Sequence, residues 1–230
     1  MTRLQNVNLT NDPHANQPVE TEGPSIEQAR AAIVMIHGRG ASADSILSLY
    51  PLLDAPDVTA LAPQAAGHTW YPHSFLAPLE ENQPYLDSAL RKIDAVVEDL
   101  VAHGVPSERI ALLGFSQGAC LTSEYVARHP RRYGGVMALT GGLIGPPGTA
   151  RDYAGSLAGT PVFLGTSDPD PHVPFERVKE TEAVLARMGA RVEVRRYPGM
   201  PHTINQEEIE ACRALLRAMT ATIDRPNGRG

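Results

Sequence analysis

The chain has little cysteine, no long apolar run and no excess of positive charge. Its two cysteines, Cys120 and Cys212, are too few for a disulfide framework and are typical of a reducing compartment. No apolar run approaches the roughly 18 residues needed to span a bilayer, and the N-terminal residues lack the apolar stretch of a secretory signal. The formal net charge of −6 argues against a broad cationic surface. We therefore expect a cytoplasmic protein without a membrane span that binds no nucleic acid.

Length and composition predict one domain. The chain of 230 residues is 42% hydrophobic and 20% charged, which is ordinary globular composition. Residues 1–24 are polar and show no periodicity, so we expect a loose N-terminal arm that contributes one strand near its end. Residues 224–230 are predicted to form a frayed tail. Residues 25–223 are then the single folded domain.

Short apolar runs alternate with helical patterns along this domain. The runs at residues 32–36, 110–113 and 135–139 are typical of strands buried on both faces. The clearest helix is predicted over residues 84–103, where apolar residues recur at spacings of three and four. The alternation predicts an α/β fold with a mostly parallel central sheet and helices on both faces. Ligand chemistry is expected at the carboxyl ends of the strands.

A Gly-x-Ser-x-Gly motif occupies residues 114–118, between a predicted strand and a predicted helix. Such a tight turn holds Ser116 in strained backbone angles and lifts its hydroxyl above the edge of the sheet. The backbone N–H of Gln117 could then donate to a developing oxyanion. An incidental serine in a glycine-rich turn is the alternative. The strand before the motif and the helix after it favour a nucleophile.

An activated serine needs a histidine base and a carboxylate that orients the histidine. His202 is the candidate base, because it lies between the last predicted strand and the last predicted helix. Two aspartates follow an earlier strand. Asp168 comes directly off that strand, and Asp170 begins an Asp-Pro-x-Val-Pro turn, so one orients the histidine and the other is a turn residue. The chain order Ser, Asp, His is that of α/β-hydrolases.

A second oxyanion donor is expected in the glycine-rich loop at residues 36–42. Loops of this kind at helix starts also bind phosphate. This loop lacks the Lys-Ser/Thr ending of a Walker A motif and the spacing of a dinucleotide fingerprint. The oxyanion interpretation is therefore favoured, with the backbone N–H of Arg39 as the donor.

Taken together, the motifs resemble a known family. The segments that carry the resemblance are His37-Gly-Arg-Gly-Ala41, Trp70-Tyr71, Gly114-Phe-Ser-Gln-Gly118, Asp170-Pro-His-Val-Pro174 and Pro198-Gly-Met-Pro-His202. They are similar to the phospholipase/carboxylesterase family of α/β-hydrolases, which includes acyl-protein thioesterases and small bacterial serine esterases. The resemblance runs from about residue 33 to the final helix.

The resemblance implies an α/β-hydrolase fold and a role for each matching residue. Ser116 would be the nucleophile and His202 the base. The family pattern implies Asp170 as the acid, whereas counting from the end of the strand selects Asp168. The remaining assignments are backbone oxyanion donors at Arg39 and Gln117, and a substrate-lining pair at Trp70 and Tyr71.

Two departures separate this chain from the thioesterases of the family. Pro201 precedes His202, where the family often has glycine, and the loop that carries the aspartates is longer. The motifs around Arg39 and Asp170 resemble a bacterial esterase branch more than the protein-deacylating branch. Thioesterase activity therefore does not follow from the resemblance.

We expect a serine carboxylesterase that hydrolyses short or medium acyl or small aromatic esters through an acyl-enzyme, with no metal and no cofactor. The spacings between Ser116, Asp170 and His202 leave no room for a large cap domain. An acyl-protein thioesterase or a lysophospholipase is the alternative within enzymes. A non-catalytic binding protein of the same fold would be expected to have a broken triad. The partner expected is a small-molecule ester, and the chain could form a homodimer.

Overall fold

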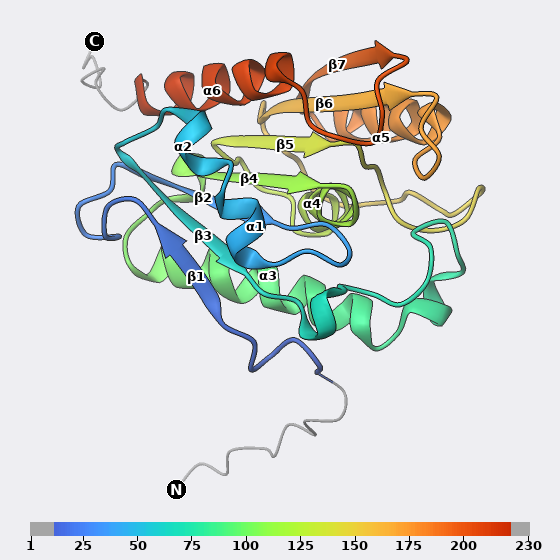
Figure 1. The fold of residues 1–230 in the computed structure, drawn as a ribbon, viewed down its shortest axis with the longest axis horizontal. Helices are drawn as coiled ribbons and strands as arrows, with labels where there is room; N and C mark the ends of the chain where they lie inside the picture. Colours follow the sequence, from blue (N-terminus) through green and yellow to red (C-terminus); the bar gives the residue numbers. More distant parts are fainter. Residues whose placement is uncertain (1–11, 222–230) are drawn as a thin grey trace, which may run out of the picture.

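The computed structural model describes residues 12–221, in which seven strands form one sheet (Figure 1). The sheet order is β1-β3-β2-β4-β5-β6-β7. The strands are β1 (Val19–Glu22), β2 (Ala31–Ile36), β3 (Val58–Pro63), β4 (Ile110–Phe115), β5 (Gly135–Leu139), β6 (Pro161–Asp168) and β7 (Arg191–Pro198). β1 is antiparallel to β3, and the other neighbouring pairs are parallel. The predicted mostly parallel sheet is confirmed.

Two hydrophobic cores lie on opposite faces of this sheet. Every residue of β2 is buried, and alternate residues enter different cores: Ala32, Val34 and Ile36 pack in one, and Ala31, Ile33 and Met35 in the other. Successive side chains of a strand point to opposite faces, so a strand covered on both sides reads as a continuous apolar run. This is the physical basis of the short apolar runs in the sequence.

Helices cover both faces, as predicted. The first core receives side chains of α3 (Tyr85–Ala102), α4 (Gln117–Arg128) and α5 (Phe175–Arg187). The second receives those of α1 (Ala43–Leu47), α2 (Tyr50–Leu53) and α6 (Gln206–Ala221). Short 3₁₀ turns lie at Ala66–His68, Leu79–Asn82 and Ser107–Arg109. Of the helices between residues 12 and 221, none combines the length and apolarity needed to cross a membrane.

The described part of the N-terminal segment is packed where the sequence predicts a loose arm. β1 is the strand expected near its end, and it pairs with β3. His14 is fully buried: its Nε2 lies 2.9 Å from the Trp70 carbonyl, and its Nδ1 accepts the Ala66 N–H at 3.0 Å. These contacts join residues distant in sequence, so local polarity did not reveal them. Residues 1–11 and the predicted tail lie outside the described residues, and the single-domain division stays a prediction.

Candidate active site

The candidate residues gather at the carboxyl ends of three parallel strands of the sheet. Ser116 follows β4 directly, Asp170 follows β6, and His202 lies in the loop between β7 and α6. In parallel sheets this edge is where ligands bind. The fold therefore brings together three residues that are far apart in the sequence.

Ser116 sits in a strained turn between β4 and α4. Its φ of 56° and ψ of −117° are angles that few non-glycine residues adopt. The two glycines of the motif permit close backbone packing around it. A Cβ on Gly118 would lie 2.0 Å from the Ile36 carbonyl oxygen, and a Cβ on Gly114 would lie 2.2 Å from the Gly118 carbonyl oxygen. Only glycine fits at these two positions without a backbone shift.

His202 makes a hydrogen bond from each side of its ring. Its Nε2 lies 2.8 Å from the Ser116 hydroxyl oxygen, and its Nδ1 lies 2.7 Å from Oδ2 of Asp170. The ring also packs against Phe115 and His172, with ring centroids 5.2 and 5.0 Å apart. A carboxylate accepts only, so we assign the proton to Nδ1, which leaves Nε2 free to accept the hydroxyl proton of Ser116.

The carboxyl group of Asp170 is held in its charged form. Burial raises its pKa, but hydrogen bonds from Ser167, from His202 and from the backbone N–H groups of Val173 and His172 outweigh burial, so the pKa lies below its usual value. The Ser167 hydroxyl donates at 2.6 Å, and the two N–H groups donate to Oδ1 at 2.8 Å each. A buried anion with four donors is well suited to orient a histidine.

Asp168 occupies a different environment from Asp170. It is the last residue of β6, and its carboxylate forms an ion pair with the half-exposed Arg196 of β7. The structure therefore brings Asp170, rather than Asp168, to His202. Both aspartates lie near the end of β6, Asp168 as its last residue and Asp170 two residues further on, so the path of the chain after the strand decides which one reaches His202.

The two predicted oxyanion donors border the same cleft as Ser116. Gly38, beside Arg39, passes close to the serine: a Cβ on Gly38 would lie 3.4 Å from the Ser116 Cβ. Gln117 is the first residue of α4. The first N–H groups of a helix have no partner within the helix, so the N–H of Gln117 is available to an anion.

The side chains of Arg39 and Gln117 hold the loop at residues 70–73 in place. The sequence did not indicate this role. Gln117 accepts the Trp70 N–H and donates to the Tyr71 carbonyl, each at 2.9 Å. The Arg39 guanidinium donates to the carbonyls of Tyr71, Pro72 and His73 at 2.9, 2.8 and 2.6 Å. Nothing local in the sequence signals these long-range contacts.

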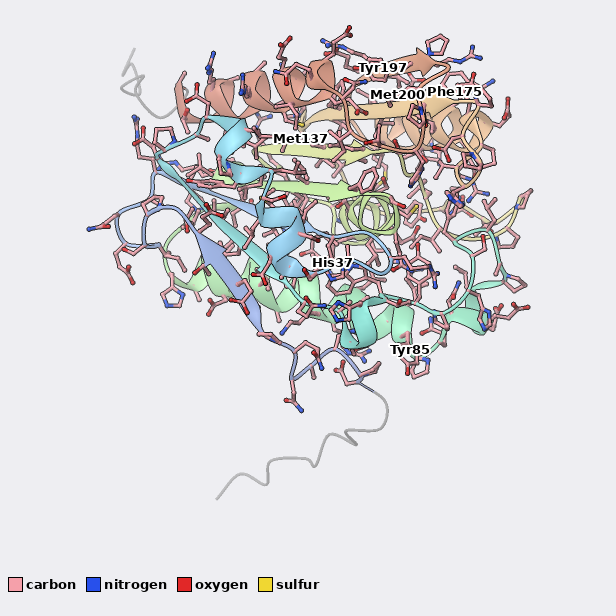
Figure 2. All side chains as sticks on the ribbon, in the orientation of Figure 1. His37, Tyr85, Met137, Phe175, Tyr197 and Met200 are labelled. Carbon is pink, nitrogen blue, oxygen red and sulfur yellow. The ribbon has the colours of Figure 1, made fainter. Side chains whose placement is uncertain are left out.

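His37 lies just past the end of β2, at the start of the glycine-rich loop (Figure 2). Its Nδ1 lies 2.7 Å from the Gly38 carbonyl, and its Nε2 accepts the Ala65 N–H at 3.1 Å. Burial lowers the pKa of His37 and outweighs the hydrogen bond with Gly38, which raises the pKa. The lowered pKa favours a neutral ring. The indole N–H of Trp70 donates to the His37 carbonyl at 2.9 Å.

The cleft above Ser116 has a volume of about 480 Å³, within the range of small-molecule sites. Tyr71 borders it, and its assignment to substrate binding stays a prediction. Trp70 does not border the cleft: it is fully buried, and its ring packs between those of His14 and His37. The other lining residues are Gly38, Arg39, Pro72, His73, Ser74, Phe75, Phe115, Gln117, Cys120, His172, Val173 and His202.

Three features define an α/β-hydrolase: the topology of the sheet, the strained turn at the serine, and the hydrogen-bonded chain of serine, histidine and aspartate. The chain belongs to the phospholipase/carboxylesterase family, whose model matches residues 19–220. The family predicted from the motifs is therefore confirmed. The relatives that this chain resembles include carboxylesterases and acyl-protein thioesterases.

Three relatives show the range of that similarity. The crystal structure of a phospholipase/carboxylesterase from Dyadobacter fermentans is 46% identical, with a TM-score of 0.85, over 88% of this chain and 97% of that one. Acyl-protein thioesterase 1 of Debaryomyces hansenii is 26% identical over 216 residues, 84% of this chain and 92% of the relative. Carboxylesterase SOBER1 of Arabidopsis thaliana is 23% identical over 208 residues, 88% of this chain and 83% of the relative.

The backbone contact at Gly118 gives a stability prediction. We expect Gly118→Ala to lower the free energy of unfolding by about 3 kcal/mol, because the added methyl meets a carbonyl oxygen that cannot rotate away. Gly135→Ala is the control, since its nearest contact would be an ordinary 3.9 Å to Leu215. Urea unfolding measures both. Equal losses in the two variants would contradict the steric account.

Proposed function

We propose that the protein is a serine carboxylesterase that hydrolyses short or medium acyl or small aromatic esters through an acyl-enzyme. The hydrogen-bonded chain from Ser116 through His202 to Asp170, open to the cleft at its serine end, carries this proposal. Membership of a carboxylesterase and thioesterase family supports it.

In acylation, Ser116 Oγ attacks the carbonyl carbon of the ester while His202 Nε2 takes the hydroxyl proton. The carbonyl oxygen becomes an oxyanion, which the backbone N–H groups of Arg39 and Gln117 stabilise. The imidazolium then gives its proton to the leaving alcohol as the C–O bond breaks. Asp170 stays ionised throughout and stabilises the imidazolium. One oxyanion donor of this kind contributes about 3–4 kcal/mol to lowering the barrier.

Deacylation reverses these roles with water in place of the alcohol. His202 removes a proton from the water as it attacks the acyl carbon, and the same oxyanion site stabilises the second tetrahedral intermediate. Ser116 leaves and recovers its proton from the imidazolium, which releases the acid. Apart from the ester and water, each step uses only side chains and backbone groups of this chain, so the proposed chemistry requires neither a metal nor an organic cofactor.

The size and lining of the cleft support the proposed substrate class. A space of about 480 Å³ accommodates a small ester. Part of the cleft wall is apolar or aromatic, which favours acyl or aryl groups over charged ones. The side chains that form this part are Tyr71, Phe75, Phe115 and Val173. Cys120 also borders the cleft, but burial raises the pKa of its thiol to about 12, which disfavours the reactive thiolate.

An acyl-protein thioesterase is the second candidate, supported by the name of the Debaryomyces hansenii relative. Rates on a thioester and an ester with the same acyl group separate the two. The lysophospholipase alternative, the cytoplasmic location and the homodimer stay predictions of the sequence. A non-catalytic binding protein would not need the serine, histidine and aspartate to share hydrogen bonds, which argues against that alternative.

A chain-length series of p-nitrophenyl esters tests the proposal. We expect hydrolysis of the shorter esters, and we expect Ser116→Ala to lower kcat by at least about 10⁴-fold because it removes the nucleophile. Ser48→Ala is the control and should leave kcat unchanged, because Ser48 is exposed and does not line the cleft. Hydrolysis that survives in Ser116→Ala would overturn the mechanism.

The two aspartates differ in their predicted effects on catalysis. Asp170→Asn should lower kcat by about 10³- to 10⁴-fold, because an amide cannot hold the required histidine tautomer or stabilise the imidazolium. Asp168→Asn should change kcat by less than about threefold, since it breaks only an ion pair with a half-exposed arginine. Steady-state kinetics of both variants decide the assignment. The reverse ranking would make Asp168 the acid.

A further inference from the structure

A buried carboxyl group lies at the start of the helix that follows His202. Glu208 is fully buried in the first turn of α6. Its Oε2 accepts the backbone N–H of Asn205 at 2.9 Å, and its own N–H donates to Oδ1 of Asn205 at 2.9 Å. This reciprocal arrangement is a capping box, in which two helix-end N–H groups are satisfied at once.

The same asparagine braces the loop that presents His202. Its side-chain amide nitrogen lies 2.9 Å from the Met200 sulfur, two residues before the histidine. At the other end of the loop, the Gly199 N–H donates to the Asp168 carbonyl at 2.9 Å. Figure 2 shows Met200 and Tyr197 together at the end of β7, where this loop begins. The loop is thus fixed at both ends, and Glu208 secures the end nearer α6.

Glu208 also touches the strand that leads to Asp170. A Cβ on Gly165 of β6 would lie 2.1 Å from Glu208 Oε1, so only glycine leaves room for the carboxyl group. The carboxyl group therefore lies between the loop of the candidate base and the strand of the candidate acid. Tyr197 of β7 and Cys212 of α6 are the titratable groups that interact with it.

Burial at this position costs free energy, because the carboxyl group of this capping residue is removed from water. Among residues 12–221, Glu208 Oε1 has no hydrogen-bond partner. Burial raises the pKa of Glu208 to about 7, against the smaller effect of the Asn205 N–H. An exposed acid would cap the helix without this penalty. A purely structural cap does not explain why the carboxyl group is buried between the two catalytic segments.

We propose that Glu208 is a positioning residue, which holds the loop of His202 against β6 so that the imidazole reaches Ser116 and Asp170 at once. This inference rests on the proposed function and adds to it a residue that acts through His202 without contacting substrate. A displacement of about 1 Å at such a base is enough to cost up to about 100-fold in rate.

The test compares variants at the two ends of α6. Glu208→Ala removes the acceptor, and Glu208→Gln keeps an oxygen for the Asn205 N–H. If Glu208→Ala folds poorly, Asn205→Ala opens the same box from its less buried side. Met219→Ala is the control, since it truncates a buried side chain near the far end of the helix. Each variant is measured for kcat, KM, thermal midpoint and the downfield proton signal of the His202–Asp170 hydrogen bond.

We expect Glu208→Ala and Asn205→Ala to lower kcat about 10- to 100-fold with KM within about twofold, and to lose the downfield signal. The Glu208→Gln variant should keep a kcat within about threefold of that of the wild type. Met219→Ala should lower the thermal midpoint by a similar amount and leave kcat and the signal unchanged. A Glu208→Ala variant with wild-type kcat and signal, or a Met219→Ala variant that loses as much of both, would overturn the proposal.

Ser116→Ala in the same assay separates this inference from the proposed function. If the wild type is inactive on every ester, or if Ser116→Ala stays active, the esterase mechanism fails. The proton signal then still decides whether Glu208 positions His202, because it reports the hydrogen bond to Asp170 and not turnover.

Discussion

The backbone contact between Gly118 and Ile36 is the constraint on which the site depends. It allows α4 to begin directly against the end of β2, so the loop after β2 and the first turn of α4 meet beside Ser116. A side chain at Gly118 would separate them. The strained φ of Ser116 belongs to the same turn, since the chain must reverse within one residue to place the hydroxyl above the sheet.

Around that turn, side chains fix loops that have no regular structure of their own. Arg39 and Gln117 hold the segment at residues 70–73, His37 accepts the Ala65 N–H, and Asn205 contacts Met200 in the loop of His202. The pKa values of Asp170 and Glu208 shift in opposite directions. Four donors keep Asp170 charged, whereas burial raises the pKa of Glu208 to about 7. The carboxyl group that bonds His202 and the carboxyl group in the first turn of the next helix thus have opposite environments.

The sequence predicted the sheet and the position of Ser116 because both depend on local patterns: buried parallel strands read as apolar runs, and the serine turn requires its glycines. His202 was selected by its place between the last predicted strand and the last predicted helix, by chain order and by the family motif that it ends. The choice between Asp168 and Asp170 stayed open because both follow one strand, and only the loop path separates them. Trp70 was expected in the cleft, but its indole donates to the His37 carbonyl beneath it. The contacts of His14, and the packing of Glu208 against Gly165, join residues distant in sequence, so no local pattern encodes them.

The central claim is that Ser116 carries the acyl group during turnover. Rapid mixing with a p-nitrophenyl ester, followed by acid quench and peptide mass spectrometry, tests it most directly. The account predicts one acyl group on the peptide that contains Ser116, lost again once the substrate is consumed. Continued hydrolysis with the acyl group on another residue, such as Cys120, or with no acylated peptide at all, would contradict it.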